Sequence, residues 1–290
     1  MGHEEATYRS SDGRLVEMVL YRPTDSRRRY LDQPMLVALP GGPGSGIRYL
    51  CSTLDEVGDR AHMEVAYLNL PGPHCLARSG EDAWCWIELL EGIISRLLES
   101  RHDKRVVLFG HSFGAFLALM AGIRMQSLNG LILCGGLPAM PNNPLAGFKN
   151  DDAGQLAALS EVMQGLAADD EAYRQGWEKF LPLLLAKPDD DETGTMLLGD
   201  LGMCRQTHAN GLRAIGQFDY RQLLGEVDCS TLVITGDQDR LTPMSAWNPH
   251  VPMLTERGWD FSLIPDAGHF PTHENGDFFI EEVVKWLLAR

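Results

Sequence analysis

The sequence predicts an α/β fold in which a mostly parallel central sheet is flanked by helices and carries an inserted helical segment. Short apolar runs that suit buried strands alternate with helical stretches through the first part of the chain. The alternation stops after Leu137 and resumes at Thr231, and residues 138–228 between them contain no convincing strand. In addition, a serine flanked by glycines stands where a strand gives way to a helix, in Gly110-His111-Ser112-Phe113-Gly114.

The predicted strands of the core are mostly continuous apolar runs, a pattern typical of strands that are buried on both faces of a parallel sheet. A β-hairpin precedes them, with residues 5–9 and 15–22 on either side of a Ser-Asp-Gly turn. The remaining strands are expected at 34–39, 63–70, 106–109, 131–134, 231–235 and 261–264. Helices are expected at 47–59, 84–100, 115–122 and 277–288, with a broken helix at 244–257. Because strands and helices alternate repeatedly, a mostly parallel sheet covered by helices is the most economical architecture.

Residues 138–228 are expected to form a helical cap inserted into a core that consists of residues 1–137 and 229–290. Helical stretches at 152–166, 171–185 and 197–212 are separated by loops rich in proline, glycine or acidic residues. Pro188-Asp189-Asp190-Asp191 is interpreted as one of these loops and not as a metal site. The predicted organisation is therefore one α/β core domain and one helical cap (lid) domain.

The composition argues against several classes of protein. The net charge is −15, and no basic stripe is available to replace the counterions of a nucleic acid. No apolar stretch approaches the roughly 20 residues that span a bilayer, and residues 1–10 contain no hydrophobic signal region. The six cysteines lack paired spacing, which fits free thiols in a reducing cytoplasm. We therefore expect a cytoplasmic protein without a nucleic-acid or membrane partner.

Ser112 is the candidate nucleophile of the chain. It follows the apolar run 106–109 and precedes a helix of small residues at 115–122, so the backbone must turn sharply around it. Gly110 and Gly114 permit this turn and the close packing of the helix on the sheet. The turn would expose the serine hydroxyl at the carboxyl edge of the sheet, beside a helix N-terminus that favours developing negative charge.

Together these residues make the chain resemble the α/β-hydrolase-fold serine hydrolases over nearly its whole length. In that family an acid and then a histidine follow the serine, each in a loop after a late strand. Gly236-Asp237-Gln238-Asp239 occupies the first place and Gly268-His269 occupies the second. The resemblance therefore implies a catalytic triad of Ser112, Asp239 and His269, with Asp237 as the alternative acid.

The chemistry of acyl transfer explains these residue types. A serine needs a base to take its proton during attack, and a buried carboxylate fixes the tautomer of the histidine that does so. The tetrahedral intermediate also needs hydrogen-bond donors, and the resemblance implies the backbone N–H groups of Phe113 and Gly42. Gly42 lies in the Pro-Gly-Gly-Pro-Gly loop at 40–44, which lacks the lysine of a phosphate-binding loop. The histidines show no paired ligand spacing, so neither a metal nor a cofactor is expected.

The loop at 41–44, the N-terminal hairpin and the cap resemble the proline iminopeptidases. This resemblance implies an aminopeptidase that acts on a short peptide or another small molecule. Gly176-Trp177-Glu178 is similar to a cap motif of those enzymes. Glu178 is therefore a candidate for binding a substrate amine, and Trp177 and Tyr173 are candidates for lining the pocket.

Other motifs are similar to stand-alone thioesterases. They are residues 109–115, Leu70-Pro71-Gly72 and Gly268-His269-Phe270. A thioesterase, an esterase or a lactonase of small-molecule metabolism is therefore an alternative. A non-catalytic hydrolase-fold binding protein is an alternative of another class. The sequence leaves the scissile bond and the oligomeric state open.

Overall fold

The computed structural model of the protein describes residues 3–11, 13–23, 32–70, 80, 82–99, 101–143, 145–148, 151–189, 191–202, 204–216 and 218–290. Several predictions fall partly outside these residues. They include Asp12 of the hairpin turn, Pro71-Gly72 of the thioesterase-like motif, Ser100 of the helix expected at 84–100 and Asp190 of the acidic loop.

One eight-stranded sheet forms the centre of the molecule, with the strand order β1-β2-β4-β3-β5-β6-β7-β8. The first two strands form the predicted hairpin, and β2 also pairs antiparallel with β4. All other pairs are parallel, which confirms the mostly parallel sheet. The strands are β1 (His3–Arg9), β2 (Leu15–Tyr21), β3 (Met35–Leu39), β4 (Glu64–Leu68), β5 (Val106–His111), β6 (Gly130–Cys134), β7 (Ser230–Gly236) and β8 (Trp259–Ile264).

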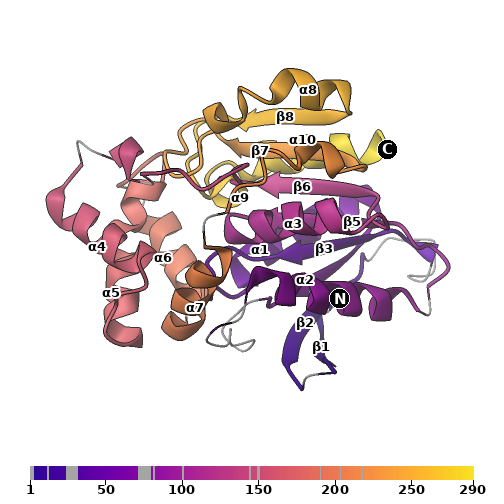
Figure 1. The fold of residues 1–290 in the computed structure, drawn as a ribbon, viewed down its shortest axis with the longest axis horizontal. Helices are drawn as coiled ribbons and strands as arrows, with labels where there is room; N and C mark the ends of the chain where they lie inside the picture. Colours follow the sequence, from indigo (N-terminus) through magenta and orange to yellow (C-terminus); the bar gives the residue numbers. More distant parts are fainter. Residues whose placement is uncertain are drawn as a thin grey trace.

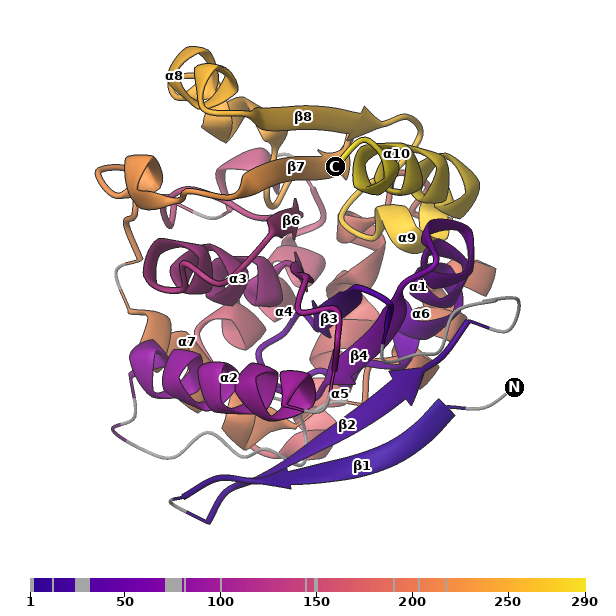
Figure 2. The same ribbon diagram turned by 90° about the vertical axis from the view of Figure 1, so that its right-hand side faces the viewer.

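Helices cover both faces of this sheet (Figure 2). One face carries α1 (Arg48–Ala61) and α10 (Gly276–Leu288), and the other carries α2 (Ala83–Leu98) and α3 (Phe113–Arg124). Along β3, Val37 and Leu39 join the core on the α2–α3 side, whereas Leu36 and Ala38 join the core on the α1–α10 side. Since both faces of the strand are buried, its apolar residues are continuous and do not alternate with polar ones. The C-terminal part is completed by η5 (Met244–Trp247), α8 (Val251–Glu256) and α9 (Pro271–Glu274).

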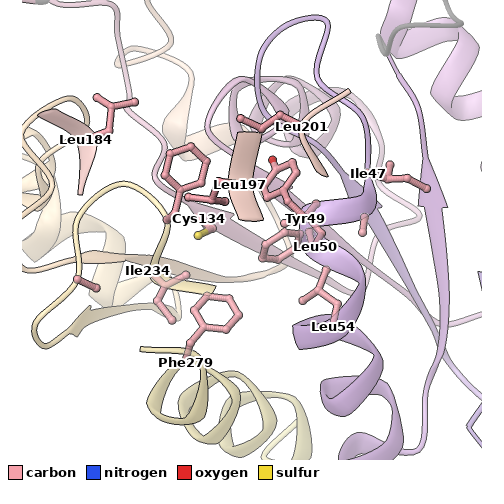
Figure 3. Close-up of a cluster of buried hydrophobic side chains, with 14 of the residues drawn as sticks. Ile47, Tyr49, Leu50, Leu54, Cys134, Leu184, Leu197, Leu201, Ile234 and Phe279 are labelled. Carbon is pink, nitrogen blue, oxygen red and sulfur yellow. The ribbon is translucent and has the colours of Figure 1, made fainter. Parts of the chain in front are cut away.

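The predicted cap region forms a group of helices beyond the carboxyl ends of the parallel strands (Figure 1). Its elements are η2 (Ala146–Phe148), α4 (Ala153–Met163), α5 (Asp170–Phe180), η3 (Leu181–Leu184), α6 (Asp191–Asp200) and α7 (Arg205–Ile215). Residues 138–228 also contain η4 (Leu224–Glu226), which instead packs against α3 of the core. Leu184, Leu197 and Leu201 of this region share a buried cluster with Tyr49 and Phe279 of the core (Figure 3). Residues 138–215, referred to below as the cap region or the cap, therefore pack on the rest of the molecule through apolar side chains.

Three expectations about the cap were wrong in detail. The helix expected at 197–212 is two helices, because α6 ends at Asp200 and α7 begins at Arg205, with Gly202 at a φ of +51° between them. The helix expected at 171–185 ends at Phe180, and a 3₁₀ turn containing Pro182 follows it. Proline cannot continue an α-helix because it lacks the backbone N–H. Asp191, expected in a loop, begins α6.

Candidate active site

Ser112 stands at a sharp turn between β5 and α3, where its backbone has a positive φ of 51°. Such a backbone is strained for a residue with a Cβ atom, at a cost on the order of 1–3 kcal/mol. The flanking glycines leave the necessary room. A Cβ atom at Gly110 would lie 2.1 Å from the Gly114 carbonyl oxygen, and one at Gly114 would lie 2.5 Å from the Pro40 carbonyl oxygen. Only glycine fits at these two positions, and the turn leaves Ser112 at the N-terminus of α3.

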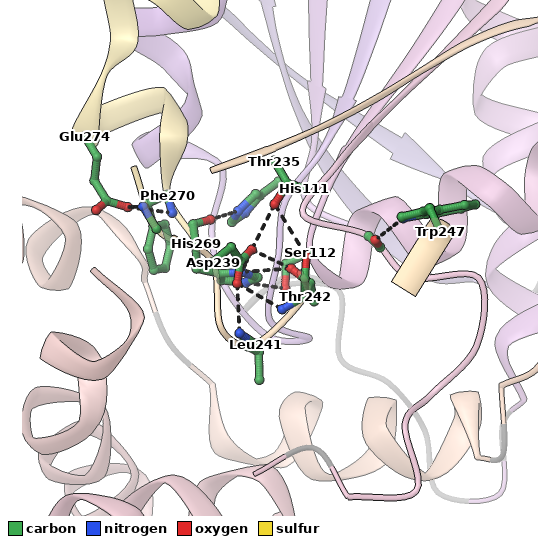
Figure 4. A network of polar contacts seen from close by, with 12 residues as sticks. His111, Ser112, Thr235, Asp239, Leu241, Thr242, Trp247, His269, Phe270 and Glu274 are labelled. Carbon is green, nitrogen blue, oxygen red and sulfur yellow. Dashed lines mark hydrogen bonds and ion pairs between the residues drawn. The ribbon is translucent and has the colours of Figure 1, made fainter. Parts of the chain in front are cut away.

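The structure brings Ser112, His269 and Asp239 together from three separate parts of the chain (Figure 4). Ser112 Oγ lies 2.9 Å from His269 Nε2, and His269 Nδ1 lies 2.9 Å from Asp239 Oδ2. Because a carboxylate accepts only, Nδ1 carries the proton and donates to Asp239. Nε2 is then free to accept the serine proton. This is the arrangement in which a histidine serves as general base to a serine.

Asp239 is buried, and four donors besides His269 hold its carboxylate. The backbone N–H groups of Leu241 and Thr242 each lie 2.9 Å from Oδ1. The hydroxyls of Thr242 and Thr235 donate to Oδ2 over 2.6 and 3.1 Å. Burial alone would raise the pKa of this carboxyl, but the neighbouring His269 and these hydrogen bonds hold it below its ordinary value. Asp239 is therefore ionised and fixed.

The alternative acid, Asp237, does not contact the histidine. Its carboxylate instead accepts a long hydrogen bond of 3.4 Å from the backbone N–H of Ala267. Of the two aspartates that the sequence left as alternatives, Asp239 is the one that lies within hydrogen-bond distance of His269.

Two backbone N–H groups beside Ser112 have no acceptor among the described residues, those of Gly42 and Phe113. Both residues line the same cavity as the serine. Gly42 has a φ of +114°, and a Cβ atom there would lie 2.8 Å from two following backbone nitrogens, so the loop needs a glycine. Unpaired N–H groups near a nucleophile are what an oxyanion requires.

A buried polar chain links the loop at 40–44 to the histidine, and the sequence reasoning missed it. The Gly41 N–H donates to Tyr49 Oη over 2.6 Å, and Tyr49 Oη donates to His111 Nδ1 over 2.8 Å. His111 Nε2 in turn donates to the backbone oxygen of His269 over 2.8 Å. Burial lowers the pKa of His111 to about 3, so the ring is neutral. His111, which directly precedes Ser112, thus connects the loop at 40–44 to the backbone of His269.

The carboxylate of Glu274 accepts hydrogen bonds from the loop that carries His269 (Figure 4). Its Oε1 accepts from the backbone N–H groups of Gly268 and Phe270, over 2.9 and 3.0 Å. Its Oε2 accepts from the Ala186 N–H of the cap region over 2.6 Å. Burial raises the pKa of this carboxyl, and the three hydrogen bonds oppose that effect. One carboxylate therefore fixes both neighbours of His269 and attaches them to the cap.

A cavity lies over Ser112, between the core and the cap. It holds about 780 Å³ of space between protein atoms, including the part that opens to solvent. None of the described residues that line it is an Asp, Glu, Lys or Arg. Most of them are apolar, among them Phe113, Phe116, Met163, Phe180, Leu212 and Ile215. The cavity therefore suits an uncharged, largely apolar group.

The three cap residues suggested by the sequence are placed differently from one another. Trp177 lines the cavity. Tyr173 is buried behind it, packed against the rings of Trp177 and His208. Glu178 lies on the exposed side of α5 and forms an ion pair with Arg174, so the structure does not bring it to the cavity. The reason is helical phase, since consecutive helical residues point about 100° apart.

The described residues were also searched for metal-binding clusters, membrane-spanning helices and disulfides. The structure contains no group of three or more His, Cys, Asp or Glu side chains there that could hold a metal ion. None of the described helices is long and apolar enough to cross a membrane. The described cysteines are free thiols, at positions 51, 85, 134, 204 and 229.

The parallel sheet with a serine at the turn after β5 is the arrangement of an α/β hydrolase, and comparison with known protein families agrees. The family model described as "Alpha/beta hydrolase family" matches residues 36–282. The chain belongs to this family. A comparison with curated proteins gives no match.

Several solved structures are similar to this one over nearly their full length. A proline iminopeptidase from Mycobacterium smegmatis is 17% identical, with a TM-score of 0.72 and coverage of 99% of this chain and 98% of that one. A hydrolase from Pseudomonas aeruginosa is 16% identical, with a TM-score of 0.71 and 99% coverage of both chains. A thermophilic esterase from Thermogutta terrifontis is 19% identical, with a TM-score of 0.68 and coverage of 100% and 99%. At these identities the likeness shows the fold alone.

Proposed function

We propose that the protein is a serine hydrolase that cleaves a small, uncharged ester with an apolar acyl group through an acyl-enzyme. The observation that carries the proposal is the chain of two 2.9 Å contacts from Ser112 through His269 to Asp239, at the base of an apolar cavity. In this proposal Ser112 is the nucleophile, His269 is the general base and Asp239 orients the histidine.

The proposed reaction has two halves. Ser112 Oγ attacks the carbonyl carbon while His269 Nε2 takes its proton, and Asp239 stabilises the imidazolium that forms. The backbone N–H groups of Gly42 and Phe113 would bind the oxyanion, each being worth about 3 kcal/mol in the transition state. The C–O bond of the ester then breaks, and His269 returns the proton to the leaving alkoxide. In the second half His269 takes a proton from a water molecule that attacks the acyl carbon, the bond from this carbon to Ser112 Oγ breaks, and His269 returns the proton to Oγ as the acid is released.

The lining of the cavity favours an ester over a peptide with a free amino terminus. An ammonium group taken out of water needs a carboxylate partner. The described lining offers none, and Glu178 is paired with Arg174 outside it. Among the described residues the cavity therefore offers no group that would recognise the substrate of the aminopeptidase suggested by the resemblance to proline iminopeptidases. Thioesters and lactones present the same acyl centre and belong to the same proposal.

The proposed setting is cytoplasmic, with a small-molecule substrate and without a nucleic-acid or membrane partner. Free thiols at all described cysteines support a reducing compartment. The strong negative charge of −15 disfavours nucleic acid.

The test is a substrate panel with the wild-type protein and Ser112→Ala. The panel contains p-nitrophenyl esters of increasing acyl length, acyl thioesters, a lactone, and prolyl p-nitroanilide with a free and with a blocked amine. We expect turnover of the esters that Ser112→Ala abolishes. Rapid cleavage of the free prolyl amide but not of the blocked one would instead support the aminopeptidase. No turnover by a folded protein would favour a hydrolase-fold binding protein.

A further inference from the structure

The loop that carries Gly42 lies between the core and the cap, and its backbone groups are held from both sides. From the core, Tyr49 Oη of α1 accepts from the Gly41 N–H over 2.6 Å. From the cap, the Cys204 N–H donates to the Gly44 carbonyl oxygen over 3.0 Å. The position of this loop therefore depends on the cap as well as on the core.

His208 of α7 contacts the residue that follows Gly42. Its Nδ1 lies 2.9 Å from the carbonyl oxygen of Pro43, and its Nε2 lies 2.9 Å from the carbonyl oxygen of Val162 in α4. The helix also approaches the proline ring closely, since a Cβ atom at Gly211 would lie 2.4 Å from Pro43 Cγ. The His208 side chain is 1% exposed. Its ring therefore forms a buried link between the loop and the cap.

A neutral histidine can donate to only one of these two carbonyl groups, because only one ring nitrogen then carries a proton. Burial lowers the pKa of His208 to about 4, so the ring is neutral near neutral pH. The Val162 carbonyl already accepts from the Gly165 N–H over 2.9 Å. The buried Pro43 carbonyl has no donor other than His208 among the described residues. Buried carbonyl groups are rarely left without a donor, so the proton belongs on Nδ1.

The hydrogen bond to Pro43 restricts where the Gly42 N–H can lie. The peptide bond between Gly42 and Pro43 is planar, and the proline ring fixes φ at Pro43. Fewer backbone torsions than usual therefore separate the held carbonyl from Gly42. On the other side of Gly42, the Gly41 N–H is held by Tyr49. The proposed oxyanion donor thus stands between one contact to the core and one to the cap.

We propose that His208 is a positioning residue of the cap, which aims the Gly42 N–H at the oxyanion by donating from Nδ1 to the Pro43 carbonyl. The oxyanion forms only on the way to the tetrahedral intermediate, so a displaced donor should lower kcat and leave KM nearly unchanged. The cap then helps to build the catalytic site in addition to covering it. This inference rests on the proposed ester hydrolysis, in which Gly42 is one of two oxyanion donors.

The experiment replaces His208 by two amides that place their N–H groups differently. The side-chain nitrogen of Asn can occupy about the position of Nδ1, and that of Gln about the position of Nε2. His208→Asn therefore keeps a donor for Pro43, whereas His208→Gln keeps one for Val162. With p-nitrophenyl hexanoate, we expect kcat to fall by about tenfold or more in His208→Gln and to stay within a few-fold of wild type in His208→Asn.

A transition-state analogue separates positioning from stability. A pentyl trifluoromethyl ketone carries the same chain as the hexanoate on its carbonyl. Ser112 Oγ adds to the carbonyl carbon, His269 takes the serine proton, and the electron pair of the C=O bond moves to the oxygen, which becomes the oxyanion. In His208→Gln the inhibition constant should rise by about the factor by which kcat/KM falls. A smaller folded fraction would lower the activity and leave the inhibition constant unchanged.

Val162→Ala is the matched control, because it removes buried apolar contacts of α4 and leaves the backbone carbonyl groups in place. We expect a lower melting temperature with kcat and the inhibition constant close to those of wild type. If Val162→Ala lost as much kcat and inhibitor affinity as His208→Gln, loosening of the cap would explain both variants and the proposal would be overturned.

The two His208 variants can each contradict the proposal. Wild-type values of kcat and of the inhibition constant in folded His208→Gln would overturn it. A loss of about tenfold in folded His208→Asn would do the same, even if His208→Gln does not fold. In both cases hydrolysis by wild type leaves the proposed function intact. Failure of wild type to hydrolyse any ester of the panel, together with no labelling of Ser112 by a fluorophosphonate, would instead refute the proposed function itself.

Discussion

Removing the hydroxyl of Tyr49 should damage both stability and catalysis, although Tyr49 is not part of the triad. The side chain is 1% exposed, and its hydroxyl joins the Gly41 N–H to His111 Nδ1. Tyr49→Phe keeps the ring and its packing but takes away both contacts. The change therefore isolates the polar chain that runs from the loop of Gly42 to the backbone of His269.

The magnitude follows from the groups left behind. The Gly41 N–H and His111 Nδ1 would both be buried without a partner, and each costs about 1–3 kcal/mol. The free energy of unfolding should therefore fall by about 2–6 kcal/mol if the structure stays as it is. If the loop relaxes instead, Gly42 moves away from the oxyanion, and loss of one such donor lowers kcat by about 10²–10³-fold. The substitution should therefore lower the free energy of unfolding, kcat, or both.

The assay is urea unfolding together with kcat and KM on the best ester of the panel. Tyr21→Phe is the matched control, because Tyr21 is also largely buried but its hydroxyl donates to Asp59 at a distance from the site. We expect Tyr49→Phe to lower kcat at least tenfold with little change in KM, and Tyr21→Phe to leave both unchanged. If the two variants matched each other in stability and in kcat, the reasoning about the polar chain would be refuted.

The remaining predictions concern the acid and the buried histidines. Asp239→Asn should lower kcat by about 10⁴-fold because the histidine loses its fixed tautomer, whereas Asp237→Asn should stay within a few-fold of wild type; the reverse order in steady-state kinetics would contradict the assignment. His111 and His208 have folded pKa values lowered to about 3 and about 4, below the value of about 6.5 in an unfolded chain. The unfolded chain binds the extra protons, so stability should decline as pH falls from about 6.5 toward 4, by up to about 1.4 kcal/mol per pH unit for each histidine. Thermal unfolding between pH 7 and 5 checks this, and a constant melting temperature would contradict it.

The core and the position of Ser112 could be predicted because their signals are local. Residues 106–109 of β5 are a continuous apolar run, and Gly110 is required by its close contact with the backbone of Gly114, four positions later. The loops that hold Asp239 and His269 each follow directly on a strand of the sheet. Strand order and the direction of the crossovers then bring these loops to one edge of the sheet.

Contacts between residues that are far apart along the chain could not be predicted from the sequence. Tyr49 and His111 are 62 positions apart, and His111 and His269 are 158 apart, so no spacing indicates their hydrogen bonds. Glu178 was selected from a short resemblance that carries no information about which side of α5 faces the cavity. Burial of Tyr173, Trp177 and Phe180, at helical spacing, fixes that side and turns Glu178 toward solvent.

The most direct test of the central claim is covalent labelling of Ser112 by a fluorophosphonate, read by intact mass and by peptide mapping. The structure predicts one adduct per chain, located on Ser112, because His269 can take the proton of its hydroxyl. Ser112→Ala should melt at a temperature close to that of wild type and take no label, and Asp239→Asn should label much more slowly. A wild-type protein that remains unlabelled, or a Ser112→Ala variant that still labels, would contradict the role assigned to this serine.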